Sequence, residues 1–362
     1  MMIDHLQRVH ISSVEISPAT APFAGRYVNL AQPRLGAAVV WANDEFFAAK
    51  ERLIDPTTPV SVPGKYDAHG KWMDGWETRR RRVPGHDSCL VRLGFRSVIF
   101  GVDVDTTHFD GNQPVSAVVE ACDHDDESEP GEHAVWWELV PGTPLGPSRQ
   151  HLVETADQRP CRWLRLHIFP DGGVARLRVY GVAAVDWSRR DPEAPCNLLA
   201  VENGGWVIGC NDAHFGRPQH LLLPGRGVDM GDGWETRRRR EPGNDWVVLT
   251  LGSPGVLRAL EVDTAHFKGN YPDRCSVRAL PRGSFRNGGA GPGASEAEIE
   301  TLFVSSGDWP VLLPSQKLEA DRVHRFEEEL EDLGVVSHLR LDIYPDGGVS
   351  RLRAFGVPRV GP

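Results

Sequence analysis

The nine residues DGWETRRRR occupy positions 74–82, and the same nine residues return at positions 232–240. Both copies continue into Pro-Gly-x-Asp, at 84–87 and 242–245. An identity of this length inside one chain indicates a duplicated domain. A duplicated scaffold needs only its apolar pattern, so identical Asp, Glu and Arg residues point to kept chemistry or to a kept buried polar network.

Three further motifs recur in the same order. Asn43-Asp44 returns as Asn211-Asp212. Val-Asp-Thr-x-His-Phe occupies 104–109 and 262–267, and a Gly-Asn pair follows each copy. Pro-Asp-Gly-Gly-Val at 170–174 returns at 345–349. The offset is 168 residues for the first motif (211 − 43), 158 for the arginine run (232 − 74) and 175 for the last (345 − 170). Copy two has therefore lost about ten residues before its arginine run and gained about seventeen after its histidine, changes that surface loops tolerate.

The composition predicts a globular protein with two cores. The 362 residues include 25% charged and 40% hydrophobic residues, an ordinary globular mixture. The net charge of −10 and the pI near 5.8 argue against a nucleic-acid partner, despite the two arginine runs. No apolar run reaches the length of a membrane span, and the N-terminus has no signal-peptide core, so we expect no membrane partner.

The six cysteines show no CxxC spacing and do not match between the copies. A disulfide framework would be expected to duplicate with its domain. We therefore expect reduced thiols and a cytoplasmic location.

Apolar alternation predicts mostly strands. The segments concerned are 36–41, 88–93 and 98–105, followed by a closing hairpin around each Pro-Asp-Gly-Gly turn, with strands at 164–168 and 176–179 in copy one and at 339–343 and near 352 in copy two. Short strands punctuated by Gly and Pro, with few helices, predict an all-β sandwich or barrel. We place the domains at 20–185 and 196–358, with a linker at 186–195.

Two segments are predicted to be helical. One follows Asn43-Asp44, with Phe46, Phe47, Leu53 and Ile54 on its apolar side, and the other covers 322–334 in copy two only. Asp44 and Asp212 can be read equally well as helix N-caps or as site residues. The Gly- and Ser-rich residues 282–296 suggest a flexible insertion. Acidic residues 122–133 suggest a solvated loop rather than a hard-metal site, because copy two has no counterpart.

The chain has no GxGxxG, P-loop, GxSxG or HExxH motif, so nucleotide, serine-hydrolase and zinc-protease chemistry have no local signature. The two arginine runs, the two histidine motifs and the FPDGGV and YPDGGV turns instead resemble the allantoicase family over residues 20–358. The resemblance implies two tandem jelly-roll β-sandwich domains of the galactose-binding-like type, related by internal duplication. It also implies a homo-oligomer that hydrolyses allantoate to ureidoglycolate and urea in the degradation of purines and allantoin.

The repeated side chains suit allantoate, a carbon that carries one carboxylate and two ureido groups. Arginine grips a carboxylate through two parallel hydrogen bonds, and only alternate residues of an extended run can face one site. The other arginines would pair with acidic residues or solvent. The expected substrate-binding residues are Arg79, Arg81, Arg237 and Arg239, with Asp74, Asp232, Asn43 and Asn211 beside them.

Cleavage also needs an acid for the departing urea nitrogen and a base for water. His108 and His266 titrate near neutral pH, and each has an aspartate three residues earlier that can orient it. No nucleophilic Ser or Cys belongs to a repeated motif, so we expect general acid–base cleavage of the C–N bond without a covalent intermediate or cofactor. The predicted catalytic set is His108, His266, Glu77, Glu235, Asp105 and Asp263.

Three alternatives stay open. His and Asp at strand ends also serve as ligands of divalent metals. Trp72, Trp76 and Trp234 would suit a non-enzymatic carbohydrate-binding β-sandwich protein that stacks sugars on exposed rings. In a structural protein, the repeated polar residues would form a buried network that holds the domains together.

Overall fold

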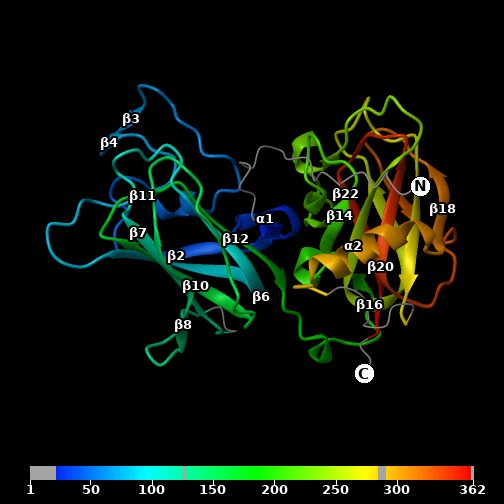
Figure 1. Cartoon of the computed structure of the whole chain (residues 1–362), viewed down its shortest axis with the longest axis horizontal. Coiled ribbons are helices and arrows are strands. Elements are labelled where there is room, and N and C mark those ends of the chain that lie inside the picture. Colours follow the sequence, from blue (N-terminus) through cyan, green and yellow to red (C-terminus); the bar gives the residue numbers. More distant parts are fainter. Residues whose placement is uncertain (1–21, 125–127, 284–290, 360–362) are drawn as a thin grey trace, which may run out of the picture. The chain divides into compact units, whose positions relative to one another are not determined.

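The computed structural model describes residues 22–124, 128–283 and 291–359. One compact unit spans Thr20–Ala184, and the other includes Val185–Pro362. Each unit contains an eight-stranded antiparallel sheet that folds into a jelly-roll β-sandwich, with the same strand order in both (Figure 1). The prediction of an all-β fold built from an internal duplication is confirmed.

The sheet of the first unit is organised by one long strand. Its strands are β1 (Val28–Asn29), β2 (Ala38–Ala42), β6 (Asp87–Asp105), β7 (Ser116–Cys122), β8 (Trp136–Pro144), β9 (Leu152–Glu154), β10 (Cys161–Phe169) and β12 (Arg176–Ala183). The 19-residue β6 pairs with β2 and β10 along its first part and with β9 and β12 along its second part. It therefore belongs to both layers of the sandwich.

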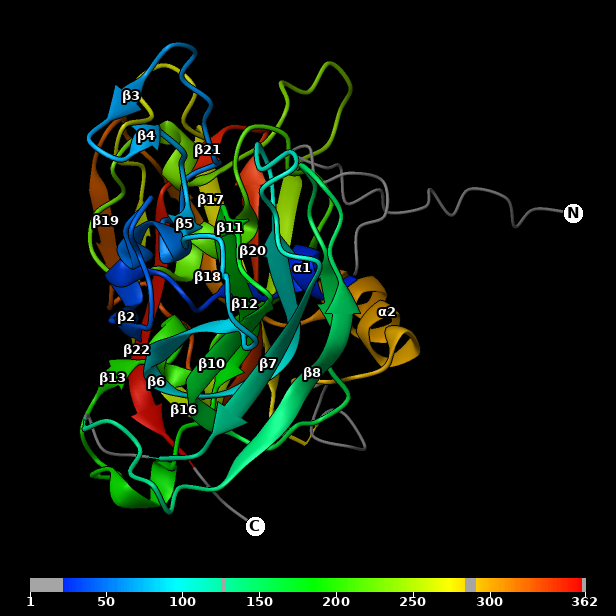
Figure 2. The ribbon, with the colours of Figure 1, turned by 90° about the vertical axis from the view of Figure 1, so that its left-hand side faces the viewer.

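Small elements complete this unit. They are the two-stranded ribbons β3 (Tyr66–Asp67) with β4 (Gly70–Lys71) and β5 (Trp76–Glu77) with β11 (Gly173–Val174), the helix α1 (Pro22–Arg26), and the 3-10 turns η1 (Pro33–Leu35) and η2 (Lys50–Ile54). The pairing of β5 with β11 joins the arginine run to the Pro-Asp-Gly-Gly turn (Figure 2).

The second unit repeats this plan. Its strands are β13 (Cys196–Asn197), β14 (Trp206–Cys210), β15 (Trp234–Glu235), β16 (Asp245–Asp263), β17 (Arg274–Pro281), β18 (Val311–Lys317), β19 (Val323–Phe326), β20 (Val335–Tyr344), β21 (Gly348–Val349) and β22 (Arg351–Pro358). Helical segments are α2 (Glu296–Ser305) and the 3-10 turns η3 (Trp187–Arg189), η4 (Val201–Asn203), η5 (Pro218–Leu222), η6 (Met230–Asp232) and η7 (Ser306–Asp308). β16 takes the place of β6, and β20 and β22 take the places of β10 and β12.

Alternate residues of the central strands fill both cores. Each buried Leu or Ile side chain contributes about 1.5–3 kcal/mol relative to exposure. Those with no exposed surface include Leu164, Leu166 and Ile168 on β10 and Leu339, Leu341 and Ile343 on β20. All six cysteines lie in the described residues, and none of them forms a disulfide there.

A glycine lets each long strand pass close to a neighbouring turn. A Cβ at Gly94 would lie 1.7 Å from the carbonyl oxygen of Leu35, and one at Gly252 would lie 1.7 Å from that of Asn203. Only glycine permits this approach. The duplication has kept the contact in both units.

The predicted closing hairpin is wrong in both units. Only the two-residue strand β11 separates β10 from β12 in the sequence, but β10 and β12 pair with different parts of β6 and not with each other. β20 and β22 likewise pair with different parts of β16. The intervening turn does not fold back tightly, because its Gly173-Val174 segment is taken up by β5.

The predicted helix after Asn43-Asp44 is also wrong. Only the 3-10 turn η2 forms there, and Phe46 is exposed. Oδ1 of Asp44 accepts a hydrogen bond from the Phe46 N–H at 3.0 Å, which closes a local turn instead of capping a helix.

Copy two departs from the prediction at two places. Residues 322–334 contain the strand β19 and an irregular segment rather than a helix. The helix that does form is α2, whose capping box joins Ser295 and Glu298. Residues 284–290 of the expected insertion, and 125–127 of the acidic loop, lie outside the described residues.

Candidate active site

Glu77 is where two repeated motifs meet. Its Oε1 accepts a hydrogen bond from Nδ2 of Asn112 at 2.8 Å, which links the arginine run to the Gly-Asn that follows the histidine motif. Glu235 and Asn270 make the same contact in the second unit. Burial raises the pKa of Glu77 above its ordinary value, and the Asn112 hydrogen bond opposes this only in part. A partly buried carboxyl of this kind suits proton transfer.

Arg79 and Arg237 combine an ion pair with exposure to solvent. Nε of Arg79 lies 2.6 Å from Oδ2 of Asp44, and Nε of Arg237 lies 2.9 Å from Oδ2 of Asp212. The arginine side chains remain 63% and 57% exposed, so their guanidinium groups can reach a ligand. Although burial acts in the opposite direction, hydrogen bonds from Phe46 and Arg79 hold the pKa of Asp44 below its ordinary value.

Arg81 is held by a buried aspartate that the prediction did not include. Its Nη1 lies 2.5 Å from Oδ1 of Asp87, to which Asn43 also donates at 3.0 Å. Among the described residues, Nε of Arg81 and Oδ2 of Asp87 are buried without a hydrogen-bond partner. These two atoms therefore have free capacity for a polar ligand or water.

The second unit keeps this arrangement. Nη1 of Arg239 lies 2.7 Å from Oδ1 of Asp245, and Asn211 donates to the same oxygen at 3.1 Å. Nε of Arg239 and Oδ2 of Asp245 again lack partners among the described residues. The structure thus brings the predicted asparagines and arginines together in both units.

Asp74 and Asp232 are engaged in buried ion pairs instead. Oδ2 of Asp74 accepts from Nη2 of Arg176 at 2.8 Å, and Asp232 accepts from Arg351 at the same distance. Both arginines are completely buried. Burial opposes the effect, but the hydrogen bonds from Arg176 and the Val60 N–H lower the pKa of Asp74. These two aspartates hold the scaffold of each site.

His108 and His266 fasten a loop in each unit. Nε2 of His108 lies 3.1 Å from the carbonyl oxygen of Pro59, and Nε2 of His266 lies 2.6 Å from that of Gly227. Both residues have φ of 71°, in the left-handed region. Non-glycine residues in that region are held by their surroundings, which is frequent near functional sites.

The expected orientation of these histidines by aspartate is wrong. Oδ1 of Asp105 accepts from the Thr107 N–H at 2.9 Å, and Oδ2 lies 2.9 Å from Arg178. Asp263 accepts from the Ala265 N–H at 2.8 Å. Both carboxylates therefore brace the turn that follows the strand rather than the imidazole.

The exposed-tryptophan pattern of a sugar-binding surface is not present at two of the three predicted positions. Trp76 and Trp234 are completely buried, and their Nε1 atoms donate to the backbone oxygens of Asp44 and Asp212 at 2.8 Å. Trp72 is partly buried, with Nζ of Lys65 3.6 Å from its ring centroid. The rings serve mainly to pack the motifs.

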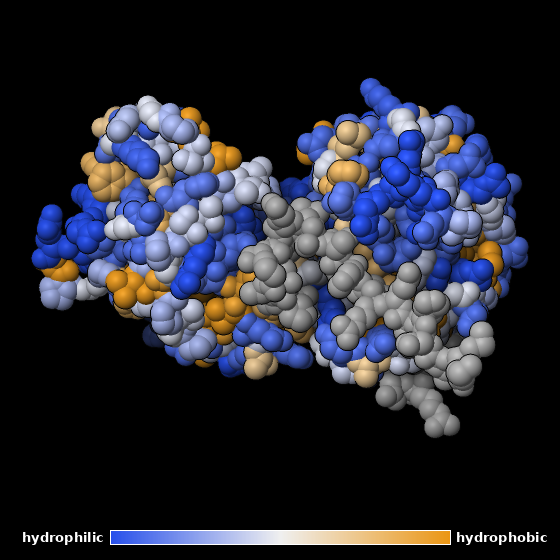
Figure 3. Space-filling model, turned by 45° about the horizontal axis from the view of Figure 1, so that its top comes forward, coloured by the Kyte–Doolittle hydropathy of each residue, from blue (hydrophilic) through white to orange (hydrophobic). Residues whose placement is uncertain are grey.

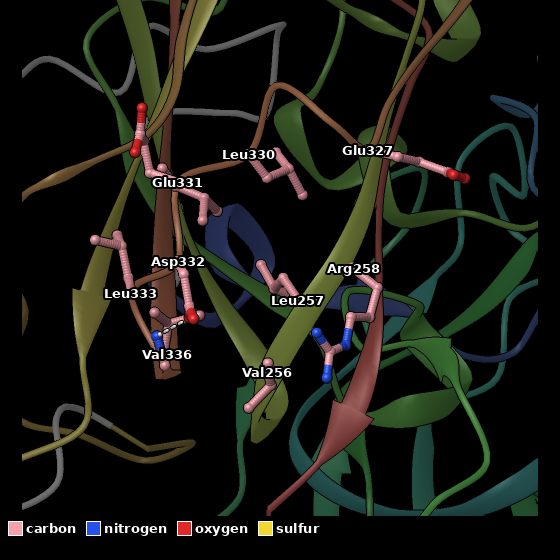
Figure 4. Close-up of a pocket in the computed structure, with 11 residues that line it drawn as sticks. Val256, Leu257, Arg258, Glu327, Leu330, Glu331, Asp332, Leu333 and Val336 are labelled. Carbon is pink, nitrogen blue, oxygen red and sulfur yellow. Dashed lines mark hydrogen bonds between the residues drawn. The ribbon is translucent and has the colours of Figure 1, made fainter.

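The second unit also has a pocket of about 160 Å³ formed by β16, β18, β20 and segment 327–334 (Figure 4). Its lining includes Leu257, Leu330 and Leu333 but no residue of the repeated motifs.

Among the described residues there is no group of three or more His, Cys, Asp or Glu side chains suited to a metal ion. The described helices include none that is both long and apolar enough to cross a membrane. The face drawn in Figure 3 is mostly hydrophilic, with separate small hydrophobic patches.

A family model for the allantoicase repeat matches residues 28–184 and 196–359. The chain belongs to the allantoicase family. A probable allantoicase of Burkholderia mallei is 53% identical over 345 residues, which is 95% of this chain and 98% of that protein. A probable allantoicase of Ralstonia nicotianae is 49% identical over 341 residues, which is 94% of this chain and 98% of that protein.

Solved structures support the same family and fold. The crystal structure of allantoicase from Saccharomyces cerevisiae matches with a TM-score of 0.71 and 34% identity, over 91% of this chain and 92% of that one. A second allantoicase structure matches with a TM-score of 0.72 at the same identity and coverage. The two allantoicase repeats, at 28–184 and 196–359, together make up nearly all of the part of this chain that aligns with these structures.

Proposed function

We propose that the protein is an allantoicase, which hydrolyses allantoate to ureidoglycolate and urea. The observation that carries the proposal is family membership: relatives named as probable allantoicases align over 98% of their own length. The burial of Trp76 and Trp234 favours an enzyme over a sugar-binding protein, because neither ring is exposed to stack on a sugar.

In the proposed reaction, one C–N bond of allantoate breaks and one C–O bond to water forms. A proton leaves the attacking water, and a proton arrives on the nitrogen of the departing urea. Arg79 and Arg81 supply positive charge for the substrate carboxylate, as do Arg237 and Arg239 in the second unit. Glu77, whose pKa burial raises above its ordinary value, is the acid that passes a proton to the leaving nitrogen in this proposal.

The remaining predicted residues receive supporting roles in this proposal. Asn43 and Asn211 fix the aspartates that hold Arg81 and Arg239. His108, His266, Asp105 and Asp263 position the loops around the site. The proposed reaction uses no metal, and measuring activity with and without a chelator tests that feature of the proposal.

The first experiment is urea release from allantoate by the purified full chain, with and without a chelator. We expect urea in both samples. Loss of urea only with chelator, restored by added divalent metal, would replace the metal-free reaction with a metal-dependent one. Absence of urea from folded protein supplied with metal would refute the allantoicase proposal.

A variant pair localises the chemistry. Glu77→Gln preserves size and removes the titrating group, so we expect turnover to fall by about 100-fold or more. Glu328→Gln, at an exposed glutamate of segment 327–334, is the matched control and should leave turnover unchanged.

A further inference from the structure

A chain of three side chains crosses the outer face of the first unit's sheet. Nε2 of His86 lies 2.9 Å from Nδ1 of His167, and Nε2 of His167 lies 2.9 Å from Oε2 of Glu120. His86 follows the Pro-Gly of the arginine motif, His167 is on β10 and Glu120 is on β7. The sequence did not predict this hydrogen-bonded group, because His86, His167 and Glu120 come together only when the sheet folds.

The chemistry of the three groups fixes where the protons lie. A carboxylate oxygen can only accept a hydrogen bond, so Nε2 of His167 is the donor to Glu120. In neutral His167, Nδ1 then carries a lone pair and accepts from the N–H at Nε2 of His86. That leaves Nδ1 of His86 as an unprotonated, basic nitrogen at the outer end of the chain.

The loop that carries His86 also holds the predicted substrate-binding arginine. Asp87, the next residue, pairs with Arg81, and the carbonyl of His86 faces Nδ2 of Asn43. A Cβ at Gly85 would lie 2.9 Å from Nη2 of Arg81, so the loop packs directly on the guanidinium group. His86, which carries the basic Nδ1, therefore lies in the sequence between Gly85, which packs on Arg81, and Asp87, which pairs with Arg81.

The charges around His86 favour its neutral form. Burial lowers its pKa first, followed by the neighbouring His167 and Arg81, while Asp87 and Glu120 act in the opposite direction. Nη1 of Arg165 lies 3.4 Å from Oε2 of Glu120, at the other end of the same three side chains. The ring of Phe169 covers one side of His86 at a centroid distance of 4.5 Å.

The second unit has lost this chain. Asn244 and Asp342 stand at the positions of His86 and His167, and Asn244 donates to Asp342 at 3.0 Å. Asp342 is also bound by Arg340, at 2.8 Å. An asparagine amide does not take up a proton near neutral pH, so this position cannot serve as a base.

The corresponding sheet face is also covered in the second unit. The ring of Phe303 on α2 lies 4.2 Å from that of Trp246 on β16, and Ser306 of η7 accepts from Arg340 at 3.1 Å. The extra residues of copy two thus close the face that carries the histidine chain in copy one.

We infer that the Glu120–His167–His86 chain provides the base of the reaction, and that the first unit alone carries out the full proton transfer. This inference rests on the proposed hydrolysis of allantoate. Nδ1 of His86 takes a proton from water as the water oxygen bonds to the substrate carbon. The C–N bond breaks, and the urea nitrogen receives a proton from Glu77. Return of the proton from His86 to Glu77 through solvent restores both groups.

The central test is His86→Asn, which imports the residue of the second unit. In the full chain we expect kcat to fall by about 100-fold or more, with KM and melting temperature little changed. His133→Asn, at an exposed histidine of the same unit, is the matched control and should keep full activity. If the wild type releases urea and His86→Asn does so equally fast, this inference fails while the proposed function stands. If the wild type releases none, both fail.

Two further measurements distinguish a proton chain from a structural contact. Glu120→Gln removes the negative charge that stabilises protonated His86, so the acidic limb of the kcat/KM profile should move to lower pH and its maximum should fall. An unchanged profile would overturn the role of Glu120. In ¹⁵N-histidine-labelled protein at neutral pH, His86 should carry its proton on Nε2. A proton on Nδ1 would overturn the proposed direction of the chain, whether or not the protein is active.

Discussion

The fully buried guanidinium of Arg176 donates from Nη2 to Oδ2 of Asp74 at 2.8 Å. It also donates to the backbone oxygens of Thr57 and Asp74, both at 3.1 Å. One residue of the arginine motif thereby neutralises a charge that lies inside the unit. The pair joins the loop before β5 to the start of β12.

Asp74→Ala should strongly destabilise the first unit. It leaves the Arg176 charge buried without its carboxylate, and such a loss costs about 3–5 kcal/mol. Urea-induced unfolding followed by fluorescence measures the change. Asp67→Ala, at an exposed aspartate of β3, is the control. A cost for Asp74→Ala no larger than that of the control would show that the pair does not hold the unit together.

Glu77→Gln should gain stability at alkaline pH while it loses turnover. Because the folded-state pKa is raised, ionised Glu77 costs the folded protein stability that is absent below the unfolded-state pKa and complete above the folded-state pKa. Glutamine avoids that cost. Melting temperatures of wild type and variant, compared at pH 4 and pH 8, test the sign, and a lower melting temperature for the variant at pH 8 would contradict it.

Asp103 should impose a pH dependence on stability. Burial, followed by the charge of Asp105, raises its pKa from 3.8 to about 6, although Arg178 opposes the shift. The unfolded chain loses this proton before the folded chain does, so the contribution to unfolding free energy falls as pH rises from about 4 to about 6. The fall is on the order of 2 kcal/mol. Subtracting the unfolding free energies of Asp103→Asn from those of wild type should isolate it, and a flat difference would exclude it.

His108→Asn should loosen the loop at 55–65 without straining the backbone. Asparagine tolerates the left-handed conformation at φ of 71°, so the substitution removes the imidazole contact to Pro59 and little else. We expect a stability loss of about 1 kcal/mol, faster proteolysis of this loop and a rise in KM that exceeds the fall in kcat. A large fall in kcat with an intact loop would instead place His108 in the chemistry.

The duplication, the strand pattern and most residues of the candidate site could be predicted from the sequence. Motif identity placed Asn43, Glu77 and Arg81 in the candidate set, and the structure brings each into a repeated contact. Asn112 and Asp87 were missed, although both stand in repeated motifs. Asn112 contacts Glu77, 35 residues earlier in the sequence, and Asp87 contacts Arg81, 6 residues earlier. The local sequence pattern does not show which side chains the fold brings together over such separations.

The errors arise where tertiary pairing overrides local preference. Phe326, Leu330 and Leu333 have helical spacing, but the edge of β16 captures residues 323–326 as a strand. Leu330 and Leu333 then line the pocket of the second unit. In contrast, the helix α2 could have been predicted, because Ser295 and Glu298 form a capping-box signature.

The long strands β6 and β16 also determine where the chain can be divided. Each is hydrogen-bonded in both layers of its own sandwich, so a break inside either one removes pairing partners from every neighbouring strand of that unit. A break in segment 186–195 leaves both strands whole. Split versions and circular permutants of this protein should therefore be opened in that segment, and a tag or fused domain placed there would interrupt neither long strand.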